Sequence, residues 1–149
     1  MHRADRNESI SQIVFEGNAL FKSITYDTGG ETWTFNFTND ISISASTLWR
    51  LLYNKRIKLV STDHLQKFGL PKPLDIIEEV STMLSAQTLT KINISNLTAD
   101  LHLEFSGNME IEIFISSGGY ESYNMYIGYK QFIGMGMGEI AVFERTKTE

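Results

Sequence analysis

Apolar and polar residues alternate along most of this chain, which is the pattern of β-strands that bury one face. In residues 32–37, for example, Trp33, Phe35 and Phe37 fall on one face and polar residues on the other. For residues 48–52, a short helix beginning at Thr47 is the alternative to a strand. The segments expected as strands are 10–15, 20–26, 32–37, 41–45, 48–52, 56–61, 90–95, 100–105, 109–115, 122–127, 131–133 and 139–143.

Residues 61–87 break this alternation. Proline suits the first turn of a helix, so Pro71 and Pro73 predict a helix start. Acidic residues in the first turns also favour the helix dipole. We expect one helix, about residues 73–85, lying across one face of the sheet. Its apolar positions recur at helical spacing and its acidic positions lie opposite: Leu74, Ile77, Val80 and Leu84, against Asp75, Glu78 and Glu79.

The β-pattern occurs twice. Residues 20–61 and 89–143 contain similar units, and aligning Phe37 with Phe105 also places Ile43 on Ile111. The order strands, helix, strands predicts an α+β fold. We expect a mainly antiparallel, twisted sheet built from two similar β-units with the helix inserted between them. Residues 10–146 would form a single domain after a flexible leader, residues 1–9.

Composition narrows the function classes. The net charge of −5 disfavours a nucleic-acid binder, which needs a basic surface to neutralise phosphates. The absence of cysteine excludes disulfides, thiol nucleophiles and sulfur-ligated metals. We also expect no membrane segment, because no apolar run approaches the roughly 20 residues that span a bilayer. The polar N-terminus lacks a signal-like apolar stretch, which favours a cytoplasmic location.

The second unit carries the most specific polar pattern. A turn at residues 106–108 would place Glu104 opposite Glu110, and His102 opposite Glu112, on the outer face of the sheet. The equivalent face of the first unit is neutral. Three interpretations remain open: a metal or acid–base site, a docking patch for a cationic partner, or a solvated outer face, which is favoured. If Glu104 and Glu110 were buried together, one pKa would rise.

Other motifs are weaker. The glycines of residues 134–138 precede a strand-like segment, so a turn or bulge is favoured over a phosphate loop. Asp63 and His64 could form an acid–base pair, although an exposed loop is favoured. Trp49 is expected in the core, with Arg50 pointing outward. The alternatives are that Arg50 stacks on Trp49, pairs with a carboxylate or contributes to an interaction surface. The second half also predicts an aromatic cluster of Phe114, Tyr120, Tyr123 and Tyr126.

Several segments resemble those of small bacterial α+β proteins of unknown function, some of which look like immunity proteins encoded beside polymorphic toxins. The resemblance covers about residues 14–143, and it implies no catalytic residue. Tyr123 stands where a second tryptophan is expected. The segments that carry the resemblance are Phe-Glu-Gly-Asn-Ala-Leu-Phe from Phe15, Leu-Trp-Arg-Leu from Leu48, Asp-Leu-His-Leu-Glu-Phe from Asp100, Met-Glu-Ile-Glu-Ile-Phe from Met109 and Ser-Gly-Gly-Tyr-Glu-Ser-Tyr from Ser117.

The leading hypothesis is a non-enzymatic protein-binding module, in one form an immunity protein that neutralises a basic toxin by occlusion. We expect no catalytic residue, cofactor or metal. A small-molecule or metal-binding domain is one alternative, and a homodimer joined through Phe114 and the tyrosine-rich strands is another. The candidate partner-binding residues are Glu104, Glu110, Glu112, His102, Phe114, Trp49, Arg50, Glu78 and Glu79.

Overall fold

In the part of the chain that the structure describes, the fold is α+β, with an 11-stranded antiparallel sheet and one α-helix. The predicted fold class and antiparallel sheet are confirmed, whereas two of the twelve expected strands merge into one. The computed structural model describes residues 10–145; the expected leader, residues 1–9, and residue 146 lie outside them. No helix in this part of the chain is long and apolar enough to cross a membrane. The strands are β1 (Ser11–Asp27), β2 (Thr32–Phe37), β3 (Ile41–Ala45), β4 (Trp49–Tyr53), β5 (Arg56–Val60), β6 (Thr88–Ser95), β7 (Leu101–Phe105), β8 (Met109–Ile113), β9 (Tyr123–Ile127), β10 (Lys130–Gly134) and β11 (Ile140–Glu144), and the helix is α2 (Ile76–Leu84).

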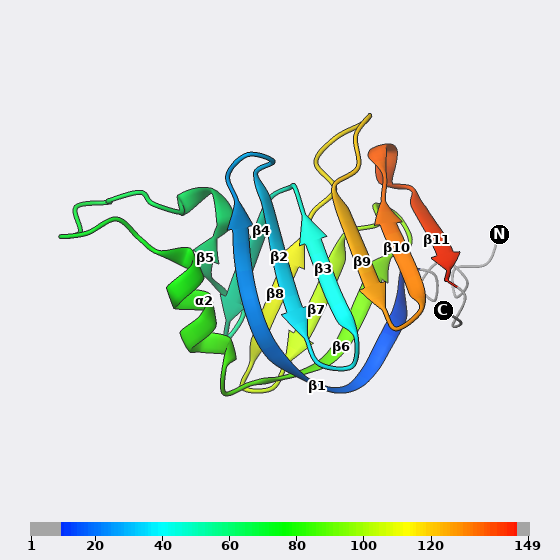
Figure 1. The fold of residues 1–149 in the computed structure, drawn as a ribbon, viewed down its shortest axis with the longest axis horizontal. Helices are drawn as coiled ribbons and strands as arrows, with labels where there is room; N and C mark the ends of the chain where they lie inside the picture. Colours follow the sequence, from blue (N-terminus) through cyan, green and yellow to red (C-terminus); the bar gives the residue numbers. More distant parts are fainter. Residues whose placement is uncertain (1–9, 146–149) are drawn as a thin grey trace.

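The strand β1 joins two layers of the sheet. Its first half pairs with β6 as far as Leu20, and its second half pairs with β2 from Phe21 onward. The strand order β11-β10-β9-β3-β2-β1-β6-β7-β8-β4-β5 therefore folds over at β1 into two facing layers (Figure 1). The expected separation into two strands, 10–15 and 20–26, is wrong, because Ser11–Asp27 is one strand. The residues between the two expected segments form bulges in this strand. Glu16 before the second bulge and Ala19 after it both pair with β6.

The core lies between the two layers. Phe35 of β2 packs edge-on against Trp49 of β4, with 5.0 Å between ring centroids, and Phe37 lies 6.0 Å from Phe105 of β7. These contacts join strands that are far apart in the sheet order, so they hold the layers face to face. Trp49 is completely buried, which confirms its predicted core position.

The helix fills one side of the sandwich. It packs against β1, and in Figure 1 it lies beside β1 and β5 instead of crossing a face as predicted. Its buried residues Ile76, Val80 and Leu84 belong to the same core as the strands. The helix begins after Asp75, whose side chain accepts a hydrogen bond from the Glu78 N–H. The predicted start at residue 73 is therefore too early, because an N-cap fixes the boundary more strongly than a preceding proline.

The two predicted hairpins have the same register. Phe37 pairs with Ile41 in the β2–β3 hairpin, and Phe105 pairs with Met109 in the β7–β8 hairpin. After each hairpin the chain crosses to the opposite layer, where β4 pairs with β8 and β9 pairs with β3. The helix considered from Thr47 is wrong, because residues 49–53 gain strand partners on both sides.

The packing around Trp49 gives a stability prediction. Its indole contacts Trp33 and Phe35, while its Nε1–H has no hydrogen-bond partner among the described residues. We expect Trp49→Ala to lower the free energy of unfolding by about 3–5 kcal/mol, because it leaves a large cavity. Trp49→Phe removes the unpaired donor and keeps most of the volume, so its cost should be well below that of alanine. Urea unfolding followed by circular dichroism measures both, and equal losses for the two variants would contradict this account.

Candidate functional site

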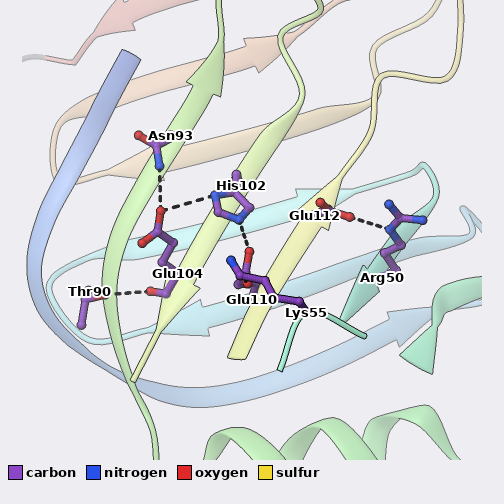
Figure 2. A network of polar contacts seen from close by, with 8 residues as sticks. All are labelled: Arg50, Lys55, Thr90, Asn93, His102, Glu104, Glu110 and Glu112. Carbon is purple, nitrogen blue, oxygen red and sulfur yellow. Dashed lines mark hydrogen bonds and ion pairs between the residues drawn. The ribbon is translucent and has the colours of Figure 1, made fainter. Parts of the chain in front are cut away.

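Ionisable side chains gather on the outer face of the layer formed by β6, β7, β8 and β4. The registers place Asn93, His102, Glu112 and Arg50 in one row across these strands. Glu104 lies opposite Glu110 in the next row, so the predicted cross-strand pairs are confirmed. Inward side chains of the same strands belong to the core, which leaves these alternate positions to face outward. Figure 2 shows that hydrogen bonds and ion pairs join one network, with the separate pair of Arg50 and Glu112 beside it. The members of the network are Asn93, Glu104, His102, Glu110 and Lys55.

Glu110 is the centre of this network. Its Oε1 lies 2.6 Å from His102 Nε2, and its Oε2 lies 2.8 Å from Lys55 Nζ. Only 11% of the Glu110 side chain is exposed, against 82% of the Lys55 side chain. Lys55 reaches this position from the β4–β5 turn, because the Asn54 N–H of that turn donates to the Asn108 carbonyl of the β7–β8 turn. The two turns are thereby held side by side.

The partners of Glu110 decide the direction of its pKa shift. Burial by itself would raise the pKa of Glu110, but the hydrogen bonds and charges of Lys55 and His102 outweigh burial and lower it. The pKa of Lys55 is raised, mainly by its hydrogen bond to Glu110. The condition for the expected rise in pKa, a Glu104–Glu110 pair buried together, is not met, because 40% of the Glu104 side chain is exposed.

Arg50 and Glu112 form a second ion pair. The Arg50 Nε lies 2.5 Å from Glu112 Oε1, and both side chains are partly exposed. The Arg50 guanidinium also lies over the Phe114 ring, 5.1 Å from its centroid, within the range of a cation–π contact. Arg50 thus points outward as predicted, and it stacks on Phe114 and not on Trp49.

Glu104 is the least satisfied carboxylate of the network. Its closest polar contacts are with Asn93 Nδ2 at 3.4 Å and His102 Nδ1 at 3.6 Å. Lys91 lies opposite Glu104 in the β6–β7 register. No lysine or arginine within residues 10–145 forms an ion pair with the Glu104 carboxylate, however, and 40% of its side chain is exposed. Glu104 lines two open hollows of about 450 and 390 Å³, the first reaching Lys55 and Met109, and the second reaching Phe114.

Three of the candidate partner-binding residues lie away from this outer face. Trp49 is fully buried, so it presents no surface to a partner. Glu78 and Glu79 lie on α2, beside a separate hollow lined by the preceding loop. The structure therefore brings together Arg50, His102, Glu104, Glu110, Glu112 and Phe114.

His64 and the glycine-rich segment, residues 134–138, lie away from the charged outer face. His64 is half-buried against Tyr26 and Trp33, and its Nδ1 accepts a hydrogen bond from the Ile76 N–H at the helix start. The exposed-loop interpretation is therefore wrong for His64. The glycine-rich segment forms a turn between β10 and β11, as favoured, with Met137 at φ 66°.

The predicted aromatic cluster does not form. Tyr123 is buried and donates its hydroxyl to the Ala99 carbonyl at 2.7 Å, whereas Tyr120 is 80% exposed in a loop. Tyr126 lies on the outer face of the β3–β9 layer beside Asn36 and Ser42. Phe114 lies beyond β8 on the opposite outer face. Their separation has a simple cause: Tyr123 and Tyr126 are an odd number of positions apart on one strand and so face opposite ways.

Sequence reasoning missed Lys55 and Asn93. Lys55 falls between the expected strands 48–52 and 56–61, and its partner Glu110 is distant in sequence. The sequence indicates only that Asn54-Lys55 is a two-residue hairpin turn. The position of this turn beside the β7–β8 turn depends on the pairing of β4 with β8. Asn93 lies opposite His102 only because β6 pairs with β7.

The charged side chains of the network face outward, where a partner could contact them. The hydrogen-bonded His102 and Glu110 are also the residue types of an acid–base pair. Within residues 10–145 no group of three His, Asp or Glu side chains is arranged to hold a metal ion. The ion pairs hold Arg50, Glu110 and Glu112 in place. Exposed Glu104 beside them remains available to a further cation.

The lowered pKa of Glu110 predicts a pH-dependent contribution to stability. Because the folded pKa lies below the ordinary value of 4.5, the stabilisation is present above that pH and is lost as the pH falls through the folded pKa. We expect wild type to be more stable than Glu110→Gln at pH 7, and the difference to shrink below about pH 4.5. Urea unfolding at a series of pH values measures the difference.

Glu121→Gln is the matched control, because Glu121 is exposed in the loop before β9. It should leave the pH profile of the free energy of unfolding unchanged. A wild-type advantage over Glu110→Gln that grows on acidification would contradict the assigned ion pairs.

Comparison with known proteins was made by family, by sequence and by structure. No protein-family model, curated protein or solved structure matches this chain. A function is accordingly inferred from the side chains of the outer face and their geometry.

Proposed function

We propose that this chain is a non-enzymatic protein-binding module whose docking surface is the outer face of β7, β8 and β4. The observation that carries the proposal is the state of Glu104, a carboxylate without a lysine or arginine partner beside two satisfied ones. Its two hollows give a partner side chain room to approach from either side. A lysine or arginine of a basic partner would give Glu104 an ion pair like those that Glu110 and Glu112 already form.

The neighbouring ion pairs favour binding because they are formed before a partner arrives. Arg50 is held between Glu112 and Phe114, so little side-chain entropy remains to be lost on association. Arginine and aromatic residues are common among the residues that dominate binding energy. Phe114 and Arg50 would supply the contact area, and Glu104 would supply charge complementarity.

The two outer faces of the molecule differ in a way that supports this surface. Asn36, Ser42 and Ser44 occupy the positions of the first hairpin that correspond to Glu104, Glu110 and Glu112. We propose that the two β-units arose by duplication and that charge was acquired on one of them. The matching hairpin registers and the reciprocal crossing of β4 and β9 support this origin.

Within this class, the proposed role is that of a bacterial, cytoplasmic immunity protein that occludes a toxin. It needs no catalytic residue, because a bound protein blocks the toxin's own site. The support is the resemblance of the segments around Phe15, Asp100 and Met109, together with the mixed aromatic and acidic surface that a basic toxin would fit.

The test is binding to the product of a neighbouring open reading frame, co-expressed with this chain. Glu104→Lys should weaken binding by at least tenfold, since the new charge repels a basic partner, and a tenfold change equals about 1.4 kcal/mol. Biolayer interferometry at two salt concentrations measures the affinity and its electrostatic share.

Asn36→Lys is the matched control, because Asn36 occupies the corresponding position on the opposite layer. It should leave binding within twofold of wild type. Equal losses for both variants, or no loss for Glu104→Lys, would show that partners do not use this face.

A small-molecule site is the second candidate, favoured by the hollow that reaches both His102 and Phe114. A ligand there would stack on the aromatic ring and hydrogen-bond to the imidazole. A metabolite that raises the melting temperature of wild type but not of His102→Ala, in the absence of any protein partner, would support this alternative.

A further inference from the structure

The strand β11 is an exposed apolar edge. It pairs with β10 on one side, and no strand among residues 10–145 pairs with its other side (Figure 1). Val142 and Phe143 are each 53% exposed, and Ile140 is 37% exposed. Exposed edges of this kind are templates for pairing with another strand unless lysine, proline or a bulge protects them. None of these features occurs within β11.

The hydrogen-bond pattern shows which backbone groups are free. The Arg145 N–H donates to the Tyr129 carbonyl, and the Met135 N–H donates to the Glu139 carbonyl. In an antiparallel pair, residues that bond to the neighbouring strand alternate with residues that do not. The odd-numbered residues of this segment therefore bond to β10. The N–H and C=O groups of Ile140, Val142 and Glu144 point outward.

We propose that β11 pairs antiparallel with β11 of a second copy of this chain, about a two-fold axis through Val142. In this register Val142 lies opposite Val142 of the other copy, and Ile140 lies opposite Glu144. Both pairs consist of outward-pointing residues, so each exchanges backbone hydrogen bonds. Two six-strand layers would join into one continuous layer.

The charges flanking β11 fit this register. It places Glu139 of each copy opposite Arg145 of the other, and both residues are exposed. They share one face of the sheet, because directly opposed residues in an antiparallel pair point the same way. In the single chain the Arg145 guanidinium points toward β9, with 4.5 Å to the Tyr126 ring centroid and a hydrogen bond from Nη2 to the Gly128 carbonyl. It exchanges these contacts for Glu139 of the other copy when the dimer forms. The same edge thus carries both complementary charges, as an isologous interface requires.

The opposite edge of the sheet lacks this complementarity. The strand β5 carries Arg56 and Lys58, so a second β5 would meet like charges there. Its exposed Ile57 is otherwise comparable with Val142, with 56% of the residue exposed. Charge therefore selects β11 over β5 as the self-pairing edge. A strand of this length buries less area than a standard interface, so the dimer should be weak and concentration-dependent.

Sedimentation velocity over a dilution series tests the proposal. Wild type should dimerise with increasing concentration, and Val142→Lys should weaken dimerisation by at least tenfold, because two lysines would face each other at the axis. The matched control is Ile57→Lys, an equally exposed apolar residue on the other edge, which should dimerise like wild type.

A charge exchange separates pairing from a general effect on folding. Glu139→Arg should weaken the dimer by placing arginines opposite each other, and the double variant Glu139→Arg with Arg145→Glu should restore it. A monomer at every concentration would overturn the proposal. So would a dimer that both Val142→Lys and Glu139→Arg leave intact, or one that Phe114→Ala abolishes. The charged face around Glu104 lies on the other layer, so partner binding can succeed or fail independently.

Discussion

The strand β1 is the constraint on which the rest of the structure depends. Because its two halves pair with β6 and β2, one continuous strand order becomes two facing layers. The apolar faces of the two layers then cover each other, and Phe35, Trp49 and Phe105 meet in a single core. Burial of apolar area is the main term that stabilises such an arrangement.

The outer faces follow from this constraint. Because alternate residues of each strand point into the core, the residues between them face outward. Core packing does not determine which residue types occupy these outward positions. The first hairpin has neutral residues at the outward positions where the second hairpin has Glu104, Glu110 and Glu112. The charged face is also ordered, because Lys55 and Arg50 fix two of its carboxylates. Ordered charge beside an unpaired carboxylate is a basis for recognition without catalysis.

The two proposed interactions use separate parts of the molecule. The Glu104 surface lies on the layer that contains β7 and β8, whereas the self-pairing edge belongs to the layer that contains β9 and β10. A dimer through β11 would therefore leave both charged faces accessible and would present a partner with two sites. Two linked sites increase the effective affinity for a partner that can reach both.

The sequence by itself determined the strand pattern, the single helix, the inward aromatic residues and the Glu104–Glu110 opposition. These features depend on period-two alternation and on short turns, which are local. Only the tertiary structure decided that β1 is continuous, that β4 lies beside β8, and that Lys55 reaches Glu110. His64 likewise meets the helix start only after folding. The physical reason is that pairing between distant strands is set by how apolar faces cover one another, and alternation alone is compatible with many strand orders.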